Sequence, residues 1–158
     1  MRNPAGRATP DDRYWMAEAI ELSTRCPRST TAFSVGAVVV DESGAEISRG
    51  YSREADALVH AEESALAKLD RRDPRLAGAT VYTSLEPCSI RKSRPASCTS
   101  LILAAGIGRV VLAWREPSLF VADCQGVRLL ADAGVEVVEL DEMAAAARAV
   151  NAYLPGMG

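Results

Sequence analysis

The sequence predicts a three-layer α/β/α sandwich around a five-stranded mixed sheet, and three observations predict this fold class. Five short segments have the apolar, β-branched composition of strands. Two of them are joined by a four-residue turn, as in a hairpin. Segments with helical periodicity separate the later strands, which is typical of parallel strands with helices on both faces of the sheet.

The N-terminal residues predict a flexible tail followed by one domain. Residues 1–10 contain two prolines, one glycine and two arginines but no apolar period. Thr9 or Asp11 can cap a helix that extends to about Thr24. We therefore expect a flexible tail over 1–10 and a single domain over 11–158.

The rest of the chain alternates between strand and helix patterns. Stretches rich in β-branched residues predict the strands, while a period near 3.6 or small residues closed by a glycine predict the helices. The expected strands cover 33–40, 45–51, 79–85, 109–114 and 135–140, and the expected helices cover 60–70, about 98–105, 122–134 and 141–154.

Composition restricts the class of function. The 158 residues are 48% hydrophobic and 25% charged, which is typical of a soluble globular protein. A net charge of -3 argues against broad nucleic-acid binding, which usually needs a basic face. The chain has neither a signal-like N-terminus nor an apolar run long enough to span a membrane. We expect a cytoplasmic protein whose four cysteines bind metal or are buried.

The candidates for chemistry are the only histidine, His60, with Glu62, Cys88 and Cys98. His60 and Cys98 stand at predicted helix starts, and Cys88 follows a predicted strand. One imidazole and two thiolates suit Zn²⁺, and three protein ligands leave the fourth position of a catalytic zinc open to water. Glu62 is two residues from His60 and does not share its helix face, which suits a proton shuttle beside the metal.

Taken singly, these residues have ordinary structural interpretations. A lone histidine is usually a polar surface or core residue, two cysteines are usually buried thiols, and a helical glutamate is usually solvated. Cys26 and Cys124 lie in no motif and are interpreted as structural, although either could close the site as a fourth ligand. The joint pattern favours zinc, because zinc deaminases carry H-x-E followed by P-C-x-x-C. Here nine residues separate the two cysteines.

Four segments together resemble the deaminase domain of the bifunctional riboflavin-biosynthesis deaminase/reductase, within the cytidine-deaminase-like superfamily. They are "VGAVVV", "HAEESAL", "TSLEPCSIRKSRPASC" and "LILAAGIGRVVLAWREPS", and the resemblance extends from about Asp12 to Leu154. It implies that His60, Cys88 and Cys98 bind zinc and that Glu62 is the general acid/base. It also implies hydrolytic loss of an exocyclic amino group from a diaminopyrimidinone ribosylamine 5′-phosphate. The chain ends about where that family's reductase begins, so we expect a stand-alone deaminase.

The resemblance also marks where substrate is bound, and here the sequence departs from the family. Ala32 stands where the family has asparagine, Ser52 where it often has histidine, and Arg94 at its basic position. The basic run 89–94 suits a phosphate contact by Arg91, Lys92 or Arg94, or is a solvated loop. The candidate substrate-binding residues are Ala32, Ser52, Ala61, Glu86, Pro87, Arg91 and Arg94.

Several alternatives remain open at this level. The substrate is the riboflavin intermediate, a related pathway-specific aminopyrimidine, a nucleotide of the dCMP or CMP type, or a nucleic-acid base; a closed, non-enzymatic zinc module is a further alternative. The resemblance also implies a homodimer or homotetramer. We expect no membrane partner, and the acidic net charge argues against a nucleic-acid partner. Four apolar residues are candidates for pocket wall, interface or core: Trp15, Trp114, Leu119 and Phe120.

Overall fold

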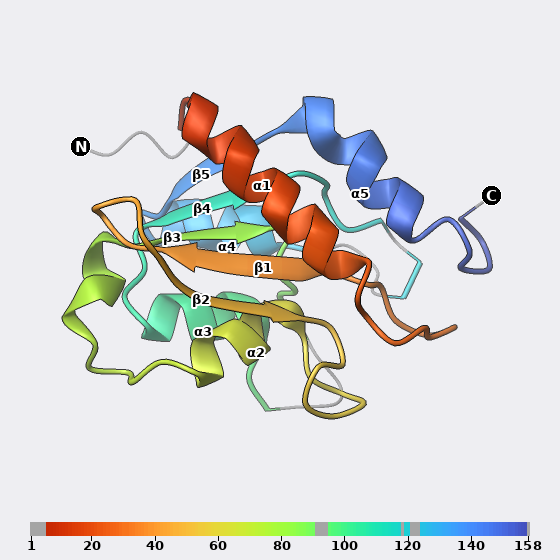
Figure 1. Cartoon of the computed structure of the whole chain (residues 1–158). Helices are drawn as coiled ribbons and strands as arrows, with labels where there is room; N and C mark the ends of the chain where they lie inside the picture. Colours follow the sequence, from red (N-terminus) through yellow and green to blue (C-terminus); the bar gives the residue numbers. More distant parts are fainter. Residues whose placement is uncertain (1–5, 91–94, 118, 121–123, 158) are drawn as a thin grey trace.

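A five-stranded mixed sheet forms the centre of the molecule (Figure 1). The structure is a computed structural model that describes residues 6–90, 95–117, 119–120 and 124–157. The strands lie in the order β2-β1-β3-β4-β5, with β1 antiparallel to both of its neighbours and β3, β4 and β5 parallel. Their bounds are β1 Gly36–Val40, β2 Glu46–Tyr51, β3 Thr80–Thr83, β4 Arg109–Leu112 and β5 Glu136–Glu139.

Helices cover both faces of this sheet. Figure 1 shows α1 (Pro10–Ser23) and α5 (Ala144–Val150) together on one face. On the other face lie α2 (Ala61–Ala67), α3 (Cys98–Ala104) and α4 (Gly126–Asp132). Two short 3₁₀ turns, η1 (Pro74–Gly78) and η2 (Asp141–Met143), precede β3 and α5. The predicted three-layer sandwich with a mixed sheet is confirmed.

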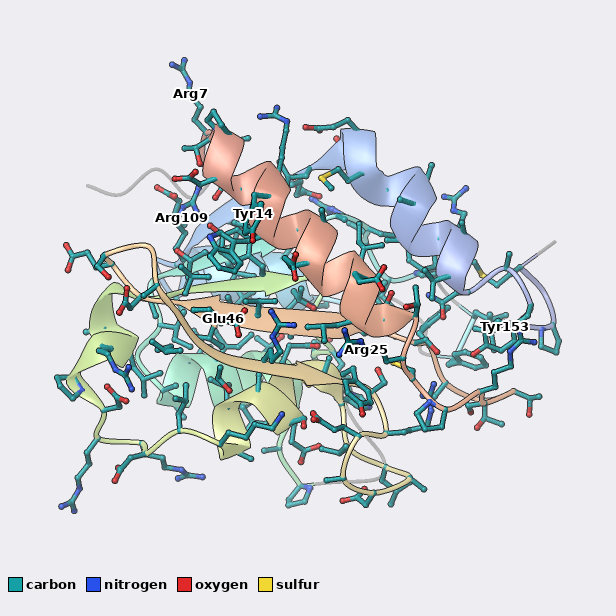
Figure 2. The ribbon with its side chains drawn as sticks, viewed as in Figure 1. Arg7, Tyr14, Arg25, Glu46, Arg109 and Tyr153 are labelled. Atoms are coloured by element: carbon teal, nitrogen blue, oxygen red, sulfur yellow. The ribbon has the colours of Figure 1, made fainter. Side chains whose placement is uncertain are left out.

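Apolar side chains from the central strands make the core. Every residue of β1 is buried, as are the interior valines of β3, β4 and β5. Strands buried on both faces consist of near-continuous apolar residues, which explains the sequence of β1. At the edge, β2 alternates between exposed and buried positions. Figure 2 shows side chains filling the space between the sheet and the helices, whereas Arg7 points away from the body.

The elements agree with the predicted ones in number, type and order, and they differ at their ends. The first strand begins at Gly36 rather than at residue 33, because side chains bind the amides before it. The amide of Ser34 donates to Asn151 Oδ1 at 2.7 Å, and that of Val35 donates to Ser52 Oγ at 3.0 Å. The last helix is shorter than predicted, since η2 precedes it and Asn151 ends it. The α4 helix starts four residues later than predicted.

The N-terminal segment lies against the far edge of the sheet from β2. Residues 1–5 of the predicted tail lie outside the described residues. The amide of Gly6 donates to the carbonyl of Val137 in β5 at 2.8 Å. Thr9 and Asp12 then form a capping box, with Thr9 N donating to Asp12 Oδ2 at 2.8 Å, so α1 begins at Pro10. None of the described helices is long and apolar enough to cross a membrane.

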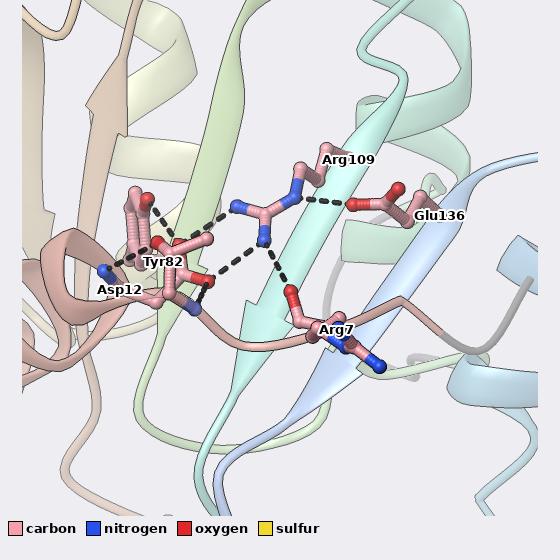
Figure 3. A network of polar contacts seen from close by, with 6 residues as sticks. Arg7, Asp12, Tyr82, Arg109 and Glu136 are labelled. Carbon is pink, nitrogen blue, oxygen red and sulfur yellow. Dashed lines mark hydrogen bonds and ion pairs between the residues drawn. The ribbon is translucent and has the colours of Figure 1, made fainter.

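An ionic cluster joins α1 to the sheet at the amino ends of the parallel strands (Figure 3). The buried Asp12 carboxylate accepts hydrogen bonds from Arg109 at 2.7 and 2.8 Å and from the Tyr82 hydroxyl at 2.8 Å. Arg109 also pairs with Glu136 of β5 and donates to the carbonyl of Arg7 at 3.4 Å. Burial alone raises the pKa of Asp12, but the bonds from Arg109 and Tyr82 outweigh it and lower that pKa.

Candidate metal centre and active site

One imidazole and two thiols come together where α2 and α3 begin. His60 is the N-cap residue of α2, Cys98 is the first residue of α3, and Cys88 lies in the loop after β3. The Nδ1 atom of His60 lies 3.4 Å from Cys98 Sγ and 3.7 Å from Cys88 Sγ. The three potential ligand atoms lie within 4.8 Å of one another. Together these residues could hold a metal ion.

Hydrogen bonds hold Cys88 against the start of α3. Ser97 caps α3 by accepting from the amide of Ser100 at 3.1 Å. The amide of Cys98 donates to Cys88 Sγ at 3.2 Å, and the amide of Thr99 donates to the Cys88 carbonyl at 3.1 Å. Two thiols ten residues apart in sequence are therefore held side by side.

The position of His60 depends on how closely α2 lies on β2. A Cβ atom at Gly50 would lie 2.6 Å from the amide nitrogen of Ala65 and 2.7 Å from the carbonyl oxygen of Ala61. Only glycine allows this approach of helix backbone to strand. At the helix start, the carboxylate of Glu63 accepts from the amide of His60 at 3.2 Å. The imidazole thus projects from a backbone fixed on both sides.

The electrostatics suit a cation held by thiolate. Hydrogen bonding with Cys98 lowers the pKa of the Cys88 thiol, and His60 adds to this effect, so that burial is outweighed. Thiolates rather than thiols are the metal-binding form of cysteine. Three donors of this chemistry fit Zn²⁺ with one coordination position left for water or substrate. Among the described residues, no further histidine, cysteine or carboxylate joins these three side chains as a fourth ligand in the cluster.

Glu62 is buried beside this cluster, with 4% of its surface exposed. Burial raises the pKa of Glu62, and its carboxyl also interacts with His60, Cys88 and Cys98. A carboxyl that holds a proton more readily than usual is suited to taking up and releasing a proton during a reaction. Glu62 is the second residue of α2 and does not share the helix face of His60. Its carboxyl therefore lies beside the cluster.

A cavity of about 560 Å³ opens onto Glu62, His60 and Cys88. That volume lies within the range of small-molecule sites. Its lining includes four of the predicted substrate-binding residues, namely Ala32, Ser52, Ala61 and Glu86. The structure therefore brings the candidate metal ligands, the candidate acid/base and most of the candidate substrate contacts to one place.

The remaining predicted substrate-binding residues are not found in the described cavity lining. Pro87 is absent from the cavity lining, and its carbonyl accepts from the Thr99 hydroxyl at 3.3 Å and from the Cys124 thiol at 3.5 Å. Arg91 and Arg94 lie outside the described residues. Ser52 Oγ accepts from the Val35 amide at 3.0 Å, so this hydroxyl also supports the cavity wall.

The Glu86 carboxylate is engaged by backbone. It accepts from the amide of Glu116 at 3.1 Å and from the amide of Val127 at 2.9 Å. These bonds tie the segments after β3 and β4 to the start of α4. Within the cavity, Glu86 thus has a structural role in addition to any contact with substrate.

Sequence reasoning missed much of the cavity wall, including Phe33, Arg53, Leu58 and Glu116. The ring of Phe33 makes edge contacts with Trp114 at 5.5 Å and with Phe120 at 4.9 Å between centroids. Trp114 is buried in the core, and Phe120 lines the cavity. The partly buried Trp15 and Leu119 pack against the core. None of the four cysteines forms a disulfide, and Cys26 donates to the Val35 carbonyl at 3.4 Å.

The mixed sheet, the two helix starts and the His-Cys-Cys cluster define a zinc-binding site of the deaminase type. The family pattern described as "Cytidine and deoxycytidylate deaminase zinc-binding region" matches residues 9–114. The chain belongs to this family.

Individual relatives agree with this assignment. The chain is 43% identical over 127 residues to the diaminohydroxyphosphoribosylamino-pyrimidine deaminase of Schizosaccharomyces pombe, covering 79% of this chain and 31% of that protein. A deaminase/reductase structure from Thermotoga maritima superposes with a TM-score of 0.76 at 30% identity, covering 89% and 39% of the two chains. The Rib2 deaminase structure of Aspergillus oryzae, at 24% identity, shares the fold with a TM-score of 0.81 and coverage of 94% and 95%.

The chain spans about a third of the length of the curated relatives it matches. The region that matches the family, residues 9–114, carries the first four strands of the sheet, the His-Cys-Cys cluster and Glu62.

Proposed function

We propose that the protein is a zinc-dependent hydrolytic deaminase that removes an exocyclic amino group from an aminopyrimidine. The observation that carries this proposal is the buried Glu62 carboxyl in one cavity with a His60, Cys88 and Cys98 cluster. The name of the S. pombe relative, at 43% identity, supports a diaminopyrimidinone ribosylamine phosphate as the substrate. The shared family supports the same class of reaction.

In this proposal, His60, Cys88 and Cys98 are the zinc ligands, and Glu62 moves the protons. Bound zinc supplies Lewis acidity that makes water a nucleophile near neutral pH. Glu62 takes a proton from the attacking water and gives one to the ring nitrogen beside the reacting carbon. It then transfers the second proton to the amino nitrogen. A C–O bond forms, the C–N bond breaks, and ammonia leaves. The ring gains a carbonyl oxygen in place of the amino group.

Glu62→Gln tests this assignment. The variant should keep one zinc per chain and a native circular dichroism spectrum, while ammonia release falls by about 10²-fold to 10⁴-fold, because an amide cannot carry protons. Metal content is measured by elemental analysis and turnover by ammonia detection with a diaminopyrimidinone ribosylamine phosphate.

The matched control is Glu63→Gln in the next position of α2. Its amide oxygen can still accept from the His60 backbone, so activity should stay close to that of the unmodified protein. A purified protein without zinc contradicts the proposal, and so does a Glu62→Gln variant that deaminates at the normal rate.

We also propose that residues 11–158 form a single domain that acts in the cytoplasm as a homodimer or homotetramer. Contacts between α1 and α5, near opposite ends of the chain, support the single domain. The lack of disulfides among the four cysteines supports a reducing compartment. The partly exposed Leu103 of α3 and Leu129 of α4 support a helix-packed interface. Light scattering after size-exclusion chromatography tests the assembly, and a monomeric mass contradicts it.

A further inference from the structure

Glu116 brings to the cavity a second carboxyl group that the proposed reaction does not use. It lies beyond the end of β4, in the segment that runs along the carboxyl edge of the parallel strands. Its own amide donates to Glu86 at 3.1 Å, which fixes its backbone. Its carboxyl interacts with the thiol of Cys124. The side chain therefore stands at a defined place in the wall of the site.

The other polar side chains of the described lining already have protein partners. Arg53 donates from Nε to the Pro27 carbonyl at 2.8 Å, from Nη1 to the Phe33 carbonyl at 3.1 Å and from Nη2 to Ser34 Oγ at 2.9 Å. The hydroxyls of Ser29 and Thr31 lie 3.3 Å apart and bond to each other.

The remaining groups are also engaged. Ser52 and Glu86 bind backbone amides, whereas His60 and Cys88 belong to the metal cluster and Glu62 is assigned to proton transfer. The Glu116 carboxyl has the thiol of Cys124 as a partner, and a thiol is a weak donor. Within the part of the cavity that the structure describes, Glu116 is therefore the carboxyl best placed to accept a hydrogen bond from a bound molecule.

The surroundings of Glu116 agree with a position inside the site. Burial, together with negative charge on Cys88, Glu62 and Glu86, raises the pKa of Glu116 to about 7, although the hydrogen bond with Cys124 opposes this effect. A carboxyl buried in this way is stabilised by a ligand that donates hydrogen bonds to it. An N–H group of an aromatic heterocycle is such a donor.

We propose that Glu116 is a substrate-recognition residue that accepts a hydrogen bond from an amino substituent other than the one removed. This inference rests on the proposed deaminase function and sharpens its substrate class. The substrate is a pyrimidine carrying at least two amino-type nitrogens, one placed at the zinc cluster and one at Glu116. Sites built to bind a particular N–H strongly reject analogues that lack it.

Two probes with the same leaving group test this recognition. 2,5,6-Triaminopyrimidin-4-one carries extra amino groups, whereas 2-aminopyrimidin-4-one carries only the amino group to be removed. In the zinc-loaded protein, Glu116→Gln should lower kcat/KM for the triamino probe by about 10-fold to 100-fold, because a bond to a charged acceptor is lost. For the monoamino probe the change should stay within about threefold. An equal loss for both probes, or no loss for either, overturns the proposal.

Direct binding separates this inference from the proposed reaction. Titration calorimetry with the triamino probe compares zinc-loaded Glu62→Gln with the Glu62→Gln/Glu116→Gln double variant. A Kd raised about 10-fold or more by the second substitution supports recognition by Glu116, even if no ammonia is released by the unmodified protein. An unchanged Kd overturns the recognition role while leaving the deaminase proposal intact.

Arg115→Gln provides the matched control. Arg115 is the neighbouring residue, but its guanidinium pairs with Glu139 at 2.7 Å and lies outside the cavity lining. Its substitution should leave both kcat/KM values and the Kd unchanged. Melting temperatures of all variants identify any that are misfolded, and Glu116→Ala serves as a second substitution at the same position.

Discussion

Gly50 shows how one residue sets the geometry of the metal cluster. The absence of a side chain lets β2 contact the backbone of α2 between Ala61 and Ala65. The imidazole of His60 immediately precedes that helix. A displaced α2 would therefore move the histidine away from the two thiols, which are held by a different segment.

Gly50→Ala is expected to destabilise the protein by about 1–3 kcal/mol, because a methyl group has no space between strand and helix. It should also weaken zinc binding. Urea unfolding and competition with a zinc-chelating dye measure the two effects.

Gly78→Ala is the control, since its nearest contacts are the flexible Glu42 side chain at 3.0 Å, and it should change stability by less than about 0.5 kcal/mol. Equal stability and zinc affinity in both variants would contradict the proposed role of Gly50.

The residues of the site were partly predictable from sequence. The spacing of H-A-E, P-C and the second cysteine predicts His60, Cys88, Cys98 and Glu62 as a group, and the structure brings these four together. Glu116 carries no such signal, because it is a single acidic residue in a loop. It reaches the cavity only because the segment after a parallel strand returns to the same edge of the sheet, a tertiary property.

At the scale of elements, local pattern predicts type and order but not where each element ends. Asn151 illustrates the reason. Its Oδ1 accepts from Ser34 N at 2.7 Å and its Nδ2 donates to Ser34 O at 3.1 Å, so one side chain shapes both the entry to β1 and the end of α5. These positions are 117 residues apart, and no periodicity within either segment reveals the contact.

Asn151→Ala is expected to destabilise the protein by about 1–3 kcal/mol, because the buried amide and carbonyl of Ser34 lose their partner. Ser34 Oγ also accepts from Arg53, so the wall around Phe33 should loosen and KM should rise more than kcat falls. Urea unfolding and steady-state kinetics measure these effects. An unfolding midpoint equal to that of the unmodified protein would show that the contact contributes nothing to stability.

In the whole molecule, the ionic cluster of Asp12, Tyr82 and Arg109 lies apart from the candidate active site. Asp12, Tyr82 and Arg109 join α1 to the amino-end half of the parallel strands, whereas Cys88 and Glu116 follow their carboxyl ends. A change in the ionic cluster should therefore alter the stability of the fold without altering the chemistry of the cavity.

Asp12→Asn is expected to cost about 3 kcal/mol at neutral pH, because the partly buried Arg109 loses one of its two charged partners and keeps Glu136. The pKa of Asp12 lies below its ordinary value of 3.8, so its contribution to stability is complete above pH 3.8 and is lost as the pH falls through the lower folded value. The difference in unfolding free energy between the unmodified protein and Asp12→Asn should therefore become smaller in acid.

Urea unfolding at pH 7, 5 and 3 measures this difference in unfolding free energy. A difference independent of pH would contradict the stabilising role of the ionised Asp12. Zinc content and kcat at pH 7 should match those of the unmodified protein, which distinguishes this variant from changes at the site.

The bond from Gly6 to Val137 has a consequence for self-association. An exposed sheet edge is a template for other chains, and β5 is one of the two edges of this sheet. The N-terminal segment occupies part of that edge, and a side chain at Gly6 would collide with Glu136, 2.5 Å away. The opposite edge, β2, carries the charged Glu46 and Arg49, which discourage pairing with a neighbour. Displacing the N-terminal segment would leave β5 open to strand addition, so this short stretch protects the protein against aggregation.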